Sequence, residues 1–190
     1  MEESLEPAPR SSAARLELAA LERDTRFTRS EIKLIYRGFK QECPSGEVDE
    51  ESFRNIFSQF FPLGDASQYA SLVFNTIKEK DSDKISFERF LSALSVWGRG
   101  SRAQKLSVVF SLYDADGDGR VSRGELLAVT RAVHLLLEPG EPDHAAQHVD
   151  RIFPLMDADR DGAVSREELS RWVSQHPALL KSLDHTDTVL

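Results

Sequence analysis

DADGDGRVSRGE, at residues 114–125, and DADRDGAVSREE, at residues 157–168, repeat one arrangement of acids and glycine. In both stretches carboxylates stand at positions 1, 3, 5 and 12, and a glycine stands at position 6. The arrangement fits the pattern D-x-[DN]-x-[DN]-G-x5-E of metal-binding loops. Apolar residues at helical spacing flank both stretches. Because one chain holds two complete matches, chance is a poor explanation, and we predict two metal loops, each between two helices.

The ligand chemistry of the two loops fits calcium. Calcium is a hard cation that takes about 6–8 oxygen ligands, and an EF-hand loop supplies them from positions 1, 3, 5, 7, 9 and 12. Position 7 offers its backbone carbonyl, and Ser122 or Ser165 at position 9 can hold a bridging water. The predicted ligands are Asp114, Asp116, Asp118, Arg120 and Glu125 in the first loop, and Asp157, Asp159, Asp161, Ala163 and Glu168 in the second.

A similar apolar frame occurs twice more in the N-terminal half. One copy, at residues 78–89, starts 36 residues before the first acidic loop, and the other, at residues 41–52, starts 37 residues further back. Ile85 and Val48 stand at position 8 of these copies. Paired EF-hand loops form a short two-stranded ladder at this position. We therefore predict an all-α fold with four EF-hands in two paired lobes, in the manner of calmodulin or recoverin.

The two upstream loops lack the ligands that calcium needs, so we predict that both are degenerate and silent. In the later copy, Lys78, Lys80 and Arg89 stand at ligand positions. At ~4–6 Å their charges would repel a divalent cation. In the earlier copy, Pro44 stiffens the loop and removes a backbone N–H. We also hypothesise that Lys78 and Arg89 replace the charge of the ion by satisfying nearby acids.

Five segments follow from these patterns. Residues 1–14 are rich in Glu, Pro, Ser and Ala, a composition that favours disorder, and residues 15–23 could form a short amphipathic helix. The predicted segments are a flexible N-terminal segment at 1–24, a calcium-silent EF-hand pair at 25–97, a hinge at 98–102, a calcium-binding EF-hand pair at 103–175, and a C-terminal helix and tail at 176–190.

Composition narrows the functional classes. The chain has 190 residues and a formal charge of −8, whereas a general nucleic-acid binder is usually basic. Its start has neither the apolar core of a secretory signal nor the Met-Gly of an N-myristoylated protein. The single Cys43 excludes an intramolecular disulfide, fits a reducing cytosol, and has no histidine partner nearby in the sequence. We expect a cytoplasmic protein that is not an enzyme and binds no nucleic acid.

Aromatic residues gather in the silent half, where nine of the eleven phenylalanines precede Gly98. We expect about half of them to form the core, and the excess to line a groove for an apolar partner helix. Only two methionines occur, so the soft, Met-rich surface of a promiscuous binder is missing. The predicted groove residues are Phe57, Phe60, Phe61, Leu91, Leu94 and Trp97.

Three stretches carry a family resemblance: YRGFKQECPSG at 36–46, QFFPLGDASQYA at 59–70 and FERFLSALSVWGRG at 87–100. They resemble the neuronal calcium sensor family, which has four EF-hands. In that family a Cys-Pro pair disables the EF-hand loop nearest the N-terminus; here that loop is residues 41–52 and the pair is Cys43-Pro44. Within the family the chain is most similar to the Kv channel-interacting proteins, a branch that includes calsenilin. Those proteins keep a weak site in the loop that corresponds to residues 78–89, and Lys78 and Arg89 here remove it.

The resemblance implies an auxiliary subunit of voltage-gated A-type potassium channels. Such a subunit clasps the apolar N-terminal segment of the channel in its aromatic groove, and it reaches the plasma membrane only through that partner. It also implies two Ca²⁺ sites at the predicted ligands, with Mg²⁺ as a candidate occupant at rest.

Other functions, and two roles for the C-terminal tail, stay open as alternatives. A calcium buffer gains nothing from silent hands, which argues against that class. A calcium-dependent regulatory subunit of a kinase, phosphatase or cyclase would use the same groove, and a calsenilin-like transcriptional repressor conflicts with the acidic charge. The tail Asp187–Leu190 could bind a PDZ domain as an added strand, or it could fold over the groove until a client displaces it.

Overall fold

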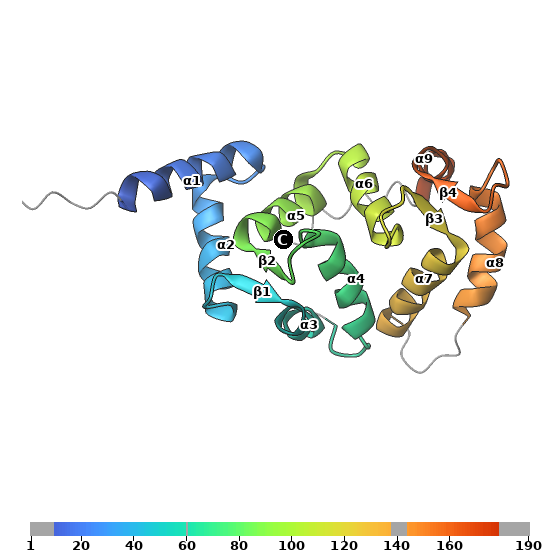
Figure 1. The fold of residues 1–190 in the computed structure, drawn as a ribbon, viewed down its shortest axis with the longest axis horizontal. Helices are drawn as coiled ribbons and strands as arrows, with labels where there is room; N and C mark the ends of the chain where they lie inside the picture. The colour runs from blue at the N-terminus through green and yellow to red at the C-terminus, as the bar shows by residue number, and fades with distance from the viewer. Residues whose placement is uncertain (1–9, 60, 138–143, 179–190) are drawn as a thin grey trace, which may run out of the picture.

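The computed structural model describes residues 10–59, 61–137 and 144–178. Within these residues, four short strands lie between the helices (Figure 1). Predictions that fall on Phe60, on residues 1–9 of the N-terminal segment, and on residues 179–190 of the C-terminal helix and tail lie outside these residues. The N-terminal half contains α1 (Arg10–Asp24), α2 (Arg29–Glu42), β1 (Glu47–Asp49), α3 (Glu50–Ser58), α4 (Ser67–Ile77), β2 (Lys84–Ser86) and α5 (Phe87–Arg99). The C-terminal half contains α6 (Arg102–Tyr113), β3 (Arg120–Ser122), α7 (Arg123–Leu137), α8 (Ala145–Met156), β4 (Ala163–Ser165) and α9 (Arg166–Ser174).

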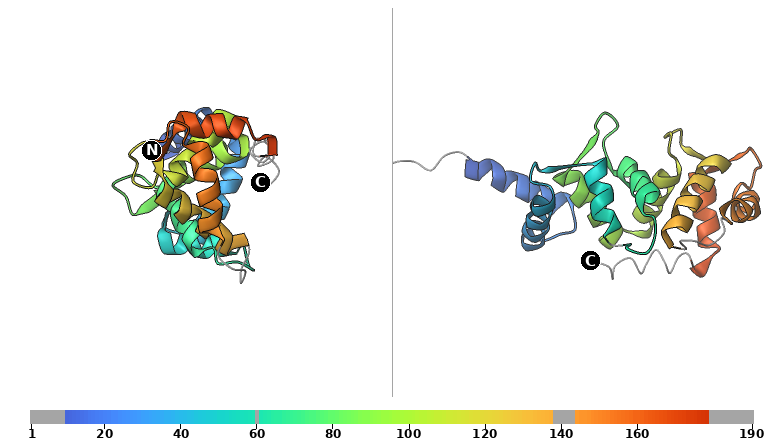
Figure 2. Two further views of the ribbon diagram at one scale, coloured as in Figure 1. Left: turned by 90° about the vertical axis from the view of Figure 1, so that its right-hand side faces the viewer. Right: turned by 90° about the horizontal axis from the view of Figure 1, so that it is seen from below.

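The order helix, loop, strand, helix occurs four times, and the strands pair two by two. β1 pairs with β2 and β3 pairs with β4, both antiparallel. The registers place Val48 opposite Ile85 and Val121 opposite Val164, which confirms the predicted pairing at position 8. All four side chains are buried, so each ladder is joined to the core of its lobe. Figure 2 shows the two lobes side by side along the long axis.

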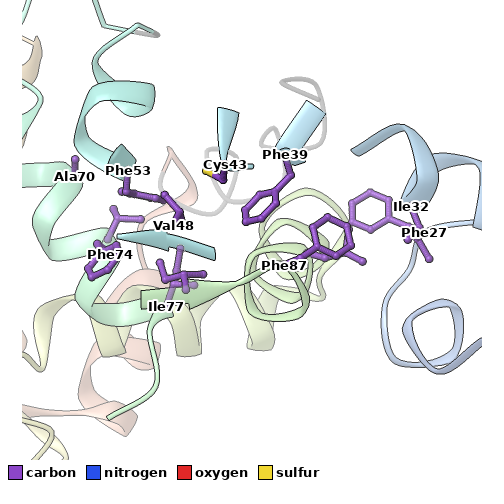
Figure 3. Packing of buried hydrophobic residues seen from close by; sticks show 13 residues of the cluster. Phe27, Ile32, Phe39, Cys43, Val48, Phe53, Ala70, Phe74, Ile77 and Phe87 are labelled. Carbon is purple, nitrogen blue, oxygen red and sulfur yellow. The ribbon is translucent and has the colours of Figure 1, made fainter. Parts of the chain in front are cut away.

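Each lobe has its own apolar core, and aromatic rings dominate the N-terminal one (Figure 3). Phe39 meets Phe87 edge to face at 5.4 Å between ring centroids, a favoured aromatic geometry. The expectation that about half of the early phenylalanines form the core is confirmed. The buried ones are Phe27, Phe39, Phe53, Phe74 and Phe87, whereas Phe57, Phe61 and Phe90 are half-buried.

The N-terminal segment is more ordered than its composition predicts. We expected a flexible segment at 1–24 with a short helix at 15–23, but α1 is helical from Arg10 onward. Leu18 and Leu21 of α1 pack against the core of the N-terminal lobe, and Arg29 pairs with Glu22 at 2.6 Å. Composition alone did not predict the full length of this helix, because its apolar residues pack against a core formed by residues distant in the sequence.

The connection between the lobes is shorter than the predicted hinge at 98–102. Helix α5 continues through Arg99, and Ser101 already caps α6 in a capping box with Gln104. The lobes also touch elsewhere, because α4 packs against α6 and α7. The Asp65 N–H donates a 3.0 Å hydrogen bond to the Leu135 carbonyl near the end of α7. Beside it, a Cβ added at Gly64 would lie 1.8 Å from the Leu136 carbonyl oxygen, so only glycine fits this contact.

The Gly64→Ala variant should separate this contact and lower the free energy of unfolding by about 1–3 kcal/mol, the usual cost of overpacking. Gly38→Ala is the matched control, because nothing lies within 4 Å of a Cβ at this α2 position. It should stabilise the protein by roughly 0.5–1 kcal/mol through helix propensity. Urea unfolding and amide exchange of Asp65 measure both effects. An unchanged stability with a protected Asp65 amide would contradict the described contact.

An ion pair fastens the start of α2 to the end of α5. Arg99 Nη1 donates to Glu31 Oε2 at 3.2 Å and to the Arg26 carbonyl at 2.7 Å, and its guanidinium lies 4.6 Å from the Phe27 ring centroid. Glu31 also accepts from the Thr28 N–H, which completes a capping box at the start of α2. The hydrogen bond from Arg99 and then those from Thr28 lower the Glu31 pKa from 4.5 to about 2.

This lowered pKa makes the ion pair sensitive to acid. A carboxylate whose pKa is depressed on folding contributes stability above its unfolded value and loses that contribution as pH falls. Glu31→Gln should therefore destabilise the protein at pH 7, and the difference should shrink as pH falls from 4.5 toward about 2. Glu88→Gln is the control, an exposed acid in the first turn of α5. A Glu31→Gln deficit that stays constant between pH 7 and pH 3 would contradict this account.

No helix among the described residues combines the length and the hydrophobicity that crossing a membrane requires.

Candidate calcium sites

The first acidic loop connects α6 to α7. Asp114 follows the last turn of α6, β3 passes through the loop, and Glu125 lies in the first turn of α7. The fold brings one carboxylate oxygen from each of Asp114, Asp116 and Glu125 within 4.8 Å of one another. Asp118, also predicted as a ligand, is not part of this cluster in the structure.

Backbone amides hold the first loop in a tight turn around its carboxylates. The Gly119 N–H donates to Asp114 Oδ2 at 3.1 Å, and Gly119 adopts φ +85°, a conformation that side chains rarely take. The Asp118 N–H donates to Asp116 Oδ1 at 3.1 Å. These bonds fix one oxygen of a carboxylate and leave the other for a ligand. Glycine at position 6 is therefore required by the geometry of the turn.

One oxygen of this loop has no hydrogen-bond partner among the described residues. Asp114 Oδ1 is buried and accepts no hydrogen bond, although its companion Oδ2 does. A buried charged oxygen without a partner is costly, and a bound cation would remove that cost. The residues of this loop therefore fit a hard divalent cation. Two observations support the fit: three carboxylates converge, and one of their oxygens, Asp114 Oδ1, is buried without a hydrogen bond.

The second acidic loop, between α8 and α9, repeats this construction. The cluster here is Asp157, Asp159 and Asp161, whose oxygens also lie within 4.8 Å. The Gly162 N–H donates to Asp157 Oδ2 at 3.1 Å, with φ +92° at Gly162. Arg160 adopts φ 60° at position 4. The loop therefore accepts a left-handed arginine in order to keep the turn.

The glutamates at position 12 are held by amides and kept charged. Glu125 accepts from the Ala115 N–H at 2.9 Å and the Ser122 N–H at 2.8 Å, and Glu168 accepts in the same way within its own loop. Burial would raise the Glu125 pKa, but the hydrogen bonds from Ser122 and Ala115 lower it overall. The Ser165 N–H is the main cause that lowers the Glu168 pKa to about 2. Both predicted ligands are therefore anionic at neutral pH.

The position-7 residues lie in the ladder between the two loops. Arg120 is the first residue of β3 and Ala163 is the first residue of β4, where their carbonyls were predicted as ligands. The guanidinium of Arg120 pairs with Asp161 in the other loop, a contact that the sequence pattern did not predict. A cation at position 7, beside an acidic partner loop, is the signal that could have indicated this contact.

The two loops of the N-terminal lobe contain ammonium and guanidinium groups that bond to their own backbone. Lys40 Nζ donates to the Pro44 carbonyl at 2.5 Å, and Lys78 Nζ donates to the Ser82 carbonyl at 3.1 Å. Arg89 Nε donates to the Ile77 carbonyl at 3.2 Å. We hypothesised that Lys78 and Arg89 satisfy nearby acids, but the described hydrogen bonds of both side chains go to carbonyl oxygens instead. A carbonyl oxygen can accept from an ammonium or guanidinium group, so each of these side chains has an acceptor without an acid.

The predicted groove residues occupy different environments. Phe57 stacks on Phe61 at 5.2 Å, and both are half-buried. Leu94 and Trp97 are also half-buried, and Trp97 lines a cavity of about 220 Å³ between α4, α5 and α6. Leu91, in contrast, is fully buried in the core, so in this structure it presents no surface to a partner.

Comparison with known families agrees with the geometry of the C-terminal lobe. Residues 103–174 match the EF-hand domain pair family. Residues 103–174 are an EF-hand pair. The match runs from α6 to α9 and contains both acidic loops with all ten predicted ligands. An EF-hand pair implies calcium binding, and it favours a calcium-binding regulatory protein over an enzyme.

The variants Glu125→Gln and Glu168→Gln should each abolish calcium binding at their own loop, because each removes the charged position-12 ligand. The double variant should bind no calcium while it keeps its helical content, since glutamine retains one acceptor for the amides. Glu167→Gln is the matched control, an exposed acid next to Glu168. Calorimetry measures binding and circular dichroism measures the fold. Loss of helix in the double variant, or calcium binding that survives in it, would contradict these roles.

Proposed function

We propose that this protein is a calcium sensor whose C-terminal EF-hand pair binds two calcium ions. The observation that carries the proposal is the pairing of two acidic loops across β3 and β4, each with three carboxylates converging within 4.8 Å. The unpartnered Asp114 Oδ1 supports it. EF-hand sensors respond at about 10⁻⁷–10⁻⁵ M calcium, and we assign both loops to this range. Two ions would change the formal charge from −8 to −4.

We infer that the N-terminal lobe is a second EF-hand pair that binds no calcium. Its helix, loop and strand order and its Val48–Ile85 ladder repeat those of the C-terminal pair. Within its loops, Lys40 and Lys78 donate to the carbonyls of Pro44 and Ser82. A lobe stabilised in this way keeps its shape at every calcium concentration. This design suits a permanently formed receptor and is of no use to a buffer.

The contacts of α7 suggest how calcium in the C-terminal lobe would affect the rest of the molecule. Glu125 lies in the first turn of α7, and Leu135 near its other end accepts a hydrogen bond from the Asp65 N–H of the N-terminal lobe. A calcium ion that draws Glu125 inward therefore acts on a helix that touches both lobes. In α9, Arg166 lies 4.4 Å from the ring centroid of Phe110, beside a cavity of about 350 Å³. Movement of α9 would change access to that cavity.

For the target we propose an apolar helix, and for the protein the role of an auxiliary subunit of voltage-gated A-type potassium channels. Support comes from the resemblance to the Kv channel-interacting proteins and from the half-buried Phe57, Phe61, Leu94 and Trp97. In this role the protein is cytoplasmic and meets the membrane through the channel. A kinase, phosphatase or cyclase as client would use the same aromatic surface.

Calorimetry of a peptide from an A-type channel N-terminus, with calcium and then with chelator, tests the target. We expect binding in both conditions, because the N-terminal lobe does not depend on calcium. Phe57→Ala should weaken binding at least tenfold, and Leu34→Ala, which changes an exposed leucine of α2, should not. Binding that requires calcium would place the receptor in the C-terminal lobe. No binding in either condition would contradict the channel role and leave another client to be found.

A further inference from the structure

We propose that Arg120 competes with calcium at the second acidic loop (residues 157–168), which is the fourth EF-hand loop of the chain. Its guanidinium holds Asp161 and weakens calcium binding there, so that the first acidic loop (residues 114–125), the third EF-hand loop, fills first. This inference rests on the proposed calcium function and concerns the order in which the same two sites are occupied. It assigns to the Arg120 side chain a role separate from that of its carbonyl, which is a predicted ligand of the third loop.

The contact joins the two loops across the ladder. Arg120 lies opposite Ser165 in the β3–β4 register, and its Nη2 pairs with Asp161 Oδ2. The other oxygen, Asp161 Oδ1, accepts the Ala163 N–H at 3.0 Å. Both oxygens of Asp161 are therefore engaged, one of them by a positive charge. Since Asp161 belongs to the carboxylate cluster of its loop, a calcium ion bound there would have to share or displace the guanidinium.

The third loop has no equivalent contact. Its position-5 residue, Asp118, accepts only the Arg120 backbone N–H, at 2.8 Å through Oδ1, among the described contacts. The residue of the fourth loop that corresponds to Arg120 is Ala163, which carries no charge. A position-7 side chain therefore places a positive charge next to residues 157–168, but none places one next to residues 114–125. This asymmetry predicts unequal affinities in two loops whose acids are nearly the same.

The expected effect is moderate because the pair is exposed. The side chains of Arg120 and Asp161 keep 47% and 38% of their surface accessible, so the ion pair itself is weak. Its removal also takes a positive charge away from the neighbourhood of a divalent ion, where repulsion falls with distance. Together these effects should raise the calcium affinity of the fourth loop about three- to tenfold when the guanidinium is removed.

The test uses the full chain in a Glu125→Gln background, which removes the third site and leaves the fourth to be measured alone. Calcium calorimetry compares this background with Arg120→Ala and Arg120→Gln added to it; the second keeps most of the side-chain length. Arg123→Ala is the matched control, because Arg123 stands at position 10 of the same loop and carries the same charge, but it pairs with Asp150 of α8 at 2.8 Å. Both Arg120 variants should bind calcium about three- to tenfold more tightly, and Arg123→Ala less than twofold.

The outcomes separate the two claims. Equal affinity with and without Arg120, while the fourth loop still binds calcium, would overturn the competitor role and leave the calcium function standing. Equal tightening by Arg123→Ala would show a general charge effect and would also overturn it. If the wild-type chain binds no calcium, the proposed function itself fails.

Discussion

The structure depends on a three-residue antiparallel ladder in each lobe. Val121 opposite Val164, and Val48 opposite Ile85, join two loops by backbone hydrogen bonds and extend their buried side chains into the core. A single loop has few contacts outside itself, and in the two acidic loops the converging carboxylates also repel one another. Pairing fixes the turns, and the turns place the flanking helices. The ligands, the cavities and the contact between the lobes all follow from that arrangement.

Charge then distinguishes the two ladders. In the N-terminal lobe, Lys40 and Lys78 donate to carbonyls of the loops and Arg89 donates to the last carbonyl of α4, so positive charge is supplied by the chain itself. In the C-terminal lobe, carboxylates converge and Asp114 Oδ1 has no partner, so positive charge must come from outside. Arg120 is intermediate, because it lies in an acidic loop and donates its charge to the neighbouring one. The same paired-loop architecture thus gives one lobe that does not depend on calcium and one lobe that responds to it.

Sequence reasoning predicted what depends on local spacing. The acidic loops follow from residues a few positions apart. The pairing of Val121 with Val164 could be predicted although the two residues are distant, because each stands at position 8 of a recognisable loop pattern, and the structure contains it. Sequence reasoning missed what depends on distant partners. The sequence around Gly64 indicates only a turn, and it does not predict that the Leu136 carbonyl lies too close for any side chain at this position. The Arg120–Asp161 pair crosses 41 residues, and the loop pattern says nothing of side chains at position 7.

The central claim is that two loops bind calcium and two do not, and the most direct measurement is the number of calcium ions bound per chain. Calorimetry of the full chain should give two ions, and the Glu125→Gln, Glu168→Gln double variant should give none. A count of zero for the wild-type chain, or any calcium that remains bound to the double variant, would contradict this division between a calcium-binding lobe and a silent one.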